Sequence, residues 1–93
     1  MAKSRVNSAS KLAPIHAGET LREDYLEPLG LRVNKLALGL SVPATRMAEI
    51  VHERRSISPD TALRLARHFQ TTPRFWLNLQ TTFDLEFEQP ISE

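Results

Sequence analysis

The apolar residues of the chain recur at three- and four-residue spacing in five stretches, and this spacing predicts five α-helices. In the first stretch Leu21, Tyr25 and Leu29 fall on one face. Gly30 follows this stretch and permits the left-handed turn that often closes a helix. The first helix is therefore expected over about residues 18–28.

Two short helices are expected next, over roughly 33–40 and 43–52. They are separated by only a few residues, and Pro43 suits the first position of the second of them. Their spacing predicts that the following apolar residues face inward: Leu36, Ala37, Leu40, Met47, Ile50 and Val51.

Two strong helix-start signals come later in the chain. Ser58 followed by Pro59 supplies a capping hydroxyl and a proline at the first position, and predicts a helix to about Phe69. Thr72 and Pro73 repeat the signal, which predicts a last helix over about 73–84. Since no run alternates as a strand would, the fold class expected is all-α with five helices.

The chain divides into an arm, one domain and a tail. Residues 1–14 contain three basic and no acidic residues and are expected to be a flexible basic arm. The domain is expected over 15–89, with residues 90–93 as the tail. A chain of 93 residues has room for only one such domain.

Composition excludes several classes of function. There are no cysteines, so disulfides, thiolate metal sites and cysteine nucleophiles are excluded. No apolar run approaches the roughly 20 residues that cross a bilayer, and the polar start does not resemble a signal peptide, so the cytoplasm is the expected location. His16, His52 and His68 are too widely spaced to predict a metal site. Neither a metal nor a cofactor is expected, and no enzyme motif is present.

Charge is balanced over the whole chain but not along it. Twelve Lys and Arg against eleven Asp and Glu give a net charge of +1, which does not indicate a nucleic-acid binder. Residues 32–55, however, carry five cations and two acids, a net +3, whereas residues 82–93 carry four acids and no cation. The sum hides a basic region over the two short helices.

These two short helices have the spacing of a helix-turn-helix unit, at about 33–52. A small residue, Ala37, lets the second helix cross the first closely, and the second helix then leaves a polar edge that fits the major groove of DNA. Arg46 can bond guanine or a phosphate, while Arg54 and Arg55 are placed for phosphates. The candidate DNA-binding residues are Lys35, Pro43, Ala44, Thr45, Arg46, Glu49, His52, Arg54 and Arg55. The simpler alternative is a polar surface helix of a small bundle.

The last helix and the residues after it are more apolar than a single chain requires. We expect this region to form a homodimer interface through Trp76, Gln80, Phe83 and Phe87, with packing inside one chain as the alternative.

The chain resembles the HigA/VapI family of antitoxins, which have a helix-turn-helix of the XRE (Cro-repressor-like) type. The resemblance covers about residues 16–85. It rests on the runs His16-Ala-Gly-Glu, Val33-Asn-Lys-Leu-Ala, Arg46-Met-Ala-Glu-Ile-Val, Ile57-Ser-Pro-Asp-Thr-Ala and Phe75-Trp-Leu-Asn-Leu-Gln. It implies a lambda-repressor-like domain, a homodimer on a palindromic operator, a HigB partner that is a RelE-like ribonuclease toxin, and repression of the shared operon.

The chain departs from the family pattern at three positions. Ala17 stands where proline is usual, and Arg32 stands where Ser or Thr usually caps the second helix, a loss of about 1 kcal/mol. Ser41 stands where the turn usually has glycine, so a left-handed conformation costs more there. Two other functions stay open: a stand-alone XRE-type regulator with no toxin, and a protein-interaction module that binds DNA weakly.

Overall fold

A computed structural model describes residues 15–87 of the chain. The arm predicted over 1–14 and the tail predicted over 90–93 lie outside the described residues. Every element in the described part is helical, as the sequence predicts: α2 (Ala17–Thr20), η2 (Leu21–Leu26), α3 (Glu27–Leu29), α4 (Val33–Leu40), α5 (Ala44–Val51), α6 (Pro59–Phe69) and α7 (Pro73–Phe87). Because α2, η2 and α3 follow one another without a break, they form one bent helical stretch, and the five predicted helices are confirmed.

The helix bounds agree with the predictions at α4 and α6 and differ elsewhere. Pro43 keeps an extended backbone, with ψ 139°, and is the N-cap of α5, so this helix begins one residue later than predicted. The first helical stretch continues through Pro28, directly after the π-helical turn η2. A proline ring clashes with the carbonyl four residues earlier in a regular α-helix, and a wider turn before it relieves that clash. Helix α7 runs three residues past the predicted end, to Phe87.

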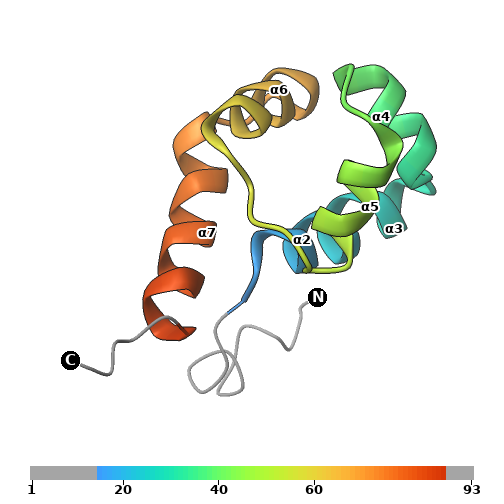
Figure 1. Ribbon diagram of the computed structural model, residues 1–93. Helices are drawn as coiled ribbons and strands as arrows, with labels where there is room; N and C mark the ends of the chain where they lie inside the picture. The colour runs from blue at the N-terminus through green and yellow to red at the C-terminus, as the bar shows by residue number, and fades with distance from the viewer. Residues whose placement is uncertain (1–14, 88–93) are drawn as a thin grey trace.

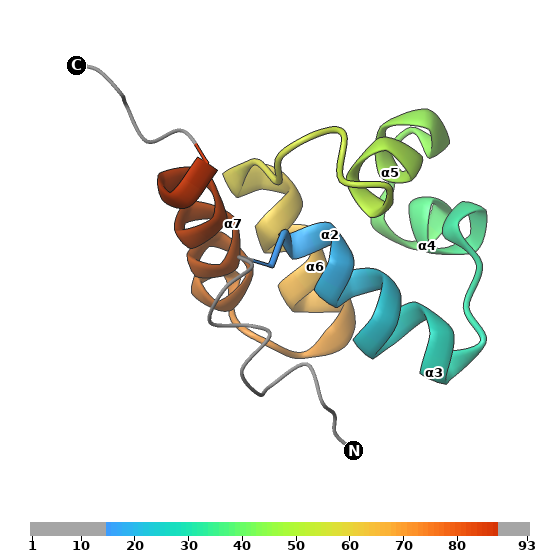
Figure 2. The ribbon, with the colours of Figure 1, turned by 90° about the horizontal axis from the view of Figure 1, so that it is seen from below.

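The helices enclose one core. In Figures 1 and 2, α4 and α5 lie on one side of the molecule and α7 on the other, and α2 contacts both α5 and α7. Trp76 is completely buried, and its indole nitrogen donates to Thr71 Oγ1 at 2.8 Å. The other large side chains that are completely buried are Leu21, Leu36, Met47, Ile50 and Leu65. These residues fix α4 and α5 against the rest of the domain.

Four helix or loop ends adopt a left-handed backbone, and only Gly30 among them is a glycine. Ser41 (φ 60°), Glu53 (φ 65°) and Gln70 (φ 60°) are the others in the described range. Ser41 is the C-cap of α4 and has the left-handed backbone conformation. The turn therefore adopts the conformation that is more costly for serine than for the usual glycine. Arg32, the N-cap of α4, makes no side-chain capping hydrogen bond, which also agrees with the sequence.

Candidate DNA interface

Helices α4 and α5 are joined by a turn of three residues, 41–43, and form a tight corner. The Val42 amide donates to the Ala37 carbonyl at 3.0 Å, which folds the turn back onto α4. Ala37 is buried, and its small side chain permits the close approach of the two helices. The corner is filled by Leu36, Leu40, Val42, Met47 and Ile50, all of them buried. The predicted helix-turn-helix packing is therefore present.

The outward face of α5 is polar. Met47, Ile50 and Val51 are buried, and at 100° per residue the opposite side of the helix carries Thr45, Glu49 and His52. We call these three residues the outward stripe. Thr45 and His52 are exposed, and the side chain of Glu49 is 44% exposed.

The other predicted DNA-binding residues surround this stripe. Pro43 and Ala44 are exposed at the N-terminal end of α5, and Lys35 is exposed on α4. Arg46 is half-buried and lies one position from the buried Met47, on the flank of α5 rather than on its outward side. It is therefore placed at the edge of the face, where its side chain can extend past the helix.

Two arginines follow α5 in the loop before α6, and one of them forms an ion pair with a residue of α5. Arg54 and Arg55 are both exposed. Arg55 Nε donates to Glu49 Oε1 at 2.7 Å, so this cation lies against the outward stripe, and the pair is neutral as a unit. Arg54 adds a second cation directly before Arg55 in the chain.

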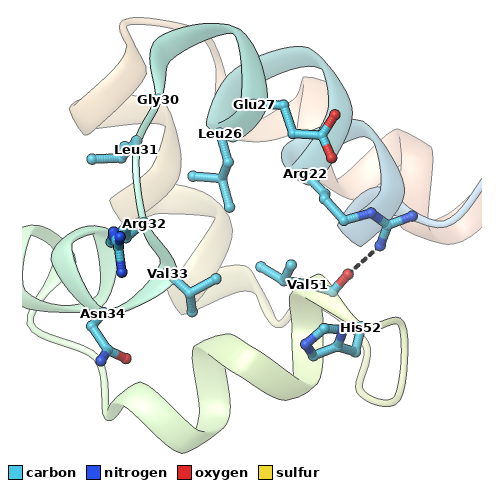
Figure 3. A pocket seen from close by; sticks show the side chains of 10 residues that line it. All are labelled: Arg22, Leu26, Glu27, Gly30, Leu31, Arg32, Val33, Asn34, Val51 and His52. Carbon is cyan, nitrogen blue, oxygen red and sulfur yellow. Dashed lines mark hydrogen bonds between the residues drawn. The ribbon is translucent and has the colours of Figure 1, made fainter.

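Two further arginines hold the ends of the helix-turn-helix in place, and neither was predicted from the sequence. Arg64 of α6 donates through Nη1 to the Leu40 carbonyl at the end of α4, at 2.8 Å. Arg22 donates through Nη1 to the Val51 carbonyl at the end of α5, as Figure 3 shows, and its Nη2 lies 3.0 Å from Glu53 Oε2. A cation at a helix C-terminus satisfies its last carbonyls and favours the helix dipole. Sequence spacing carries no signal for these contacts, because the partners are 24 and 29 residues apart.

An open hollow of about 550 Å³ adjoins the C-terminal end of α5 (Figure 3). Its apolar walls come from the first helix, the loop before α4, and α5. The lining residues are Arg22, Leu26, Glu27, Gly30, Leu31, Arg32, Val33, Asn34, Val51 and His52. Arg32 and His52 thus border one depression between the start of α4 and the end of α5.

The predicted dimer-interface residues do not all lie on the surface. Trp76 is 0% exposed and Gln80 is 3% exposed, so the prediction that these two side chains face a second chain is corrected. Trp76 belongs to the core. Gln80 Oε1 accepts from the Ile57 amide at 3.1 Å, and its Nε2 donates to Asp84 at 3.0 Å. Gln80 therefore holds the loop that follows α5.

The remaining two predicted interface residues form a ring pair at the end of α7. The centroids of Phe83 and Phe87 lie 4.5 Å apart, and Phe83 is half-buried while Phe87 is 63% exposed. Leu85, which lies on the opposite side of the helix from this pair at 100° per residue, is 67% exposed. This apolar end of α7 is available to another molecule.

Neither a metal site nor a membrane span is found within residues 15–87. No three His, Asp or Glu side chains come together there as ligands would. None of the helices is long and apolar enough to cross a bilayer.

The steep corner of α4 and α5, its filled core and the exposed polar stripe define a helix-turn-helix domain of the lambda-repressor type. No family model matches the chain. It is 48% identical over 80 residues to virulence-associated protein I of Dichelobacter nodosus, covering 86% of this chain and 74% of that protein. It is 33% identical over 76 residues to antitoxin HigA-1 of Vibrio cholerae, covering 82% and 71%. The chain belongs to the HigA/VapI family.

A solved structure of an antitoxin is also similar to this chain in fold and sequence. Pseudomonas aeruginosa antitoxin HigA, in a structure described as containing the higBA promoter, superposes with a TM-score of 0.79 at 43% identity, covering 81% of this chain and 82% of that one. The relatives named here are described as antitoxins or virulence-associated proteins, not as enzymes.

Proposed function

We propose that the chain is the antitoxin of a type II toxin–antitoxin system that binds its own operator DNA and represses the operon. The observation that carries the proposal is the polar outward stripe of α5, presented on a rigid helix-turn-helix corner and bordered by cations. The similarity to antitoxin HigA structures, one of which contains promoter DNA, also supports the proposal. An antitoxin of the family acts on DNA in the cytoplasm, which remains the location that we expect.

In this proposal α5 enters the major groove with its N-terminal residues toward the bases. Pro43, Ala44 and Thr45 are exposed at that end of the helix. Lys35 and Arg54 lie on either side of it in the sequence and serve as phosphate contacts, which fix the register without reading the sequence.

A homodimer supplies the second half-site. One chain places few cations near DNA, and two joined chains gain affinity because the second contact becomes intramolecular. We assign the interface to the ring pair at the apolar end of α7, with Phe83 half-buried at its edge and Phe87 exposed. Phe87→Ser is then expected to shift the dimer toward monomer in sedimentation velocity at micromolar concentration. Leu63→Ser, on the exposed side of α6, is the matched control.

The partner protein is a HigB-like toxin, a ribonuclease of the RelE type, as the family implies. The experiment that tests the whole function is co-purification of the product of the adjacent gene with this chain, followed by footprinting of the shared promoter. A stable complex and a protected palindrome are expected. Free toxin and an unprotected promoter would contradict the proposal.

A stand-alone regulator is the second candidate. It is favoured by the similarity to proteins described only as HTH-type transcriptional regulators, one of Haemophilus influenzae at 46% identity and one of Escherichia coli at 42%. A protected promoter without any toxin gene beside it would support this second function.

A further inference from the structure

Glu49 lies in the middle of the outward stripe of α5. A carboxylate there would be repelled by the phosphates of bound DNA. The stripe from Thr45 to His52 extends about 10 Å along the helix, close to the width of the major groove. An acid at its centre faces phosphates on both sides of that groove, and its charge opposes binding. Glu49 therefore reduces affinity unless it makes a specific contact.

The pairing with Arg55 changes this balance. Arg55 Nε bonds to one carboxylate oxygen of Glu49 at 2.7 Å, and both side chains remain about half exposed, at 51% and 44%. The pair is neutral as a unit. Within residues 15–87 the second carboxylate oxygen of Glu49 takes part in no side-chain hydrogen bond, so it is available to a donor outside the chain.

The donors that the major groove offers are few. Cytosine presents its N4 amino group and adenine its N6 amino group, whereas guanine and thymine present acceptors, which repel a carboxylate. A carboxylate accepting from cytosine N4 is one of the pairings that groove geometry favours, whereas an amide side chain favours adenine through N6 and N7 together.

We propose that Glu49 is a specificity-determining residue that reads a cytosine amino group in each half-site, while Arg55 neutralises it and extends its free guanidinium nitrogens toward the backbone phosphate. The inference rests on the proposed DNA-binding function. In this proposal the Glu49 carboxylate disfavours guanine and thymine at one operator position, because both bases present acceptors there.

The test is selection of binding sites from a randomised duplex library, followed by titration of the selected and a scrambled duplex. The proteins are the unchanged chain, Glu49→Gln, Glu49→Ala and the control Glu86→Gln, which removes an exposed carboxylate on α7, across the molecule from α5 (Figure 1). Thermal melts establish that all four are folded.

The unchanged chain and Glu86→Gln are expected to select cytosine at one position of each half-site. Glu49→Gln is expected to select adenine there, and Glu49→Ala no particular base, with the other positions unchanged. Affinity of Glu49→Ala for the selected duplex should fall by roughly 5- to 150-fold. On the scrambled duplex it should rise instead, because a negative charge is lost and Arg55 is released.

An unaltered motif and affinity in Glu49→Ala would overturn the inference while leaving the proposed function intact. A wild-type chain that selects no motif at all would overturn the proposed function, and this inference with it.

Discussion

Gly18 in α2 lies directly against the main-chain carbonyl of Ile50 in α5. A Cβ at position 18 would be 2.9 Å from the Ile50 carbonyl carbon and closer still to its oxygen. The first helix thus contacts the backbone of α5 itself. Both Gly18 and Ile50 are buried, so neither backbone can move away without opening the core.

Gly18→Ala is therefore expected to destabilise the domain by about 1–3 kcal/mol, since backbone atoms cannot yield as a flexible side chain does. Urea unfolding monitored by far-UV circular dichroism measures this change. Gly39→Ala is the matched control: a Cβ there would be 3.0 Å from Cε1 of His68, an exposed side chain that can turn aside. A loss in Gly39→Ala as large as that in Gly18→Ala would contradict the backbone argument.

Ser41 should respond in the opposite direction. Its left-handed backbone costs an L-residue about 1–2 kcal/mol, and glycine avoids most of this cost while losing more entropy on folding. We expect Ser41→Gly to raise the free energy of unfolding by about 0.5–1 kcal/mol. Ser41→Ala keeps the strain and is the control. Equal stability of the glycine and alanine variants would show that the turn is not strained.

His16 links stability to pH. Its Nδ1 accepts from the Gly18 amide at 2.8 Å, which caps α2 and requires the neutral imidazole. Burial lowers the pKa of His16 below its ordinary value of 6.5, and Arg22 acts in the same direction, while Glu53 and Asp84 oppose the shift. As the pH falls below about 6.5, the unfolded chain takes up the proton more readily than the folded chain, and stability declines.

The free energy of unfolding of the unchanged chain is thus expected to be lower at pH 5.5 than at pH 7.5. His16→Asn keeps an acceptor at the N-cap but has no proton to bind, so the difference between the two pH values should shrink. His52→Asn, which replaces an exposed histidine, should leave it unchanged. An undiminished difference in His16→Asn would show that other groups cause it.

Local signals predicted most of this fold, and long-range contacts account for what the sequence did not reveal. The proline starts and the helical period were sufficient to place α4 and α6, because caps and apolar spacing act within a few residues. The period of α5 likewise separates its buried face from its outward stripe. Arg22, Arg64 and Gln80 look like ordinary polar surface residues in the sequence, yet each bonds to a backbone group at least 23 residues away.

Gln80 gives a direct test of such a contact. Its carbonyl oxygen accepts from the buried Ile57 amide, and no apolar side chain can replace that acceptor. Gln80→Leu is expected to destabilise the domain by about 1–3 kcal/mol, the cost of a buried N–H without a partner. Asn78→Leu changes an exposed amide two residues earlier and should stay within about 0.5 kcal/mol. Thermal or urea unfolding separates the two variants.

Arg54 and Arg46 should affect DNA binding in different ways. Arg54 is exposed beyond the end of α5, so Arg54→Ala is expected to weaken binding to every duplex alike and to reduce the salt slope of log K by about one. Arg46, on the flank of α5, can reach a guanine edge. Arg46→Ala is expected to cost about 1–3 kcal/mol on the operator and less on a scrambled duplex.

Gel-shift or anisotropy titrations at several salt concentrations measure both effects. Arg74→Ala, an exposed arginine in the first turn of α7, is the matched control and should change neither the affinity nor the slope. Equal losses for Arg46→Ala on operator and scrambled DNA would place Arg46 on a phosphate instead of a base. Because α5 is held at both ends, by the turn at Ser41 and by Arg22 at Val51, these differences report on the side chains and not on a displaced helix.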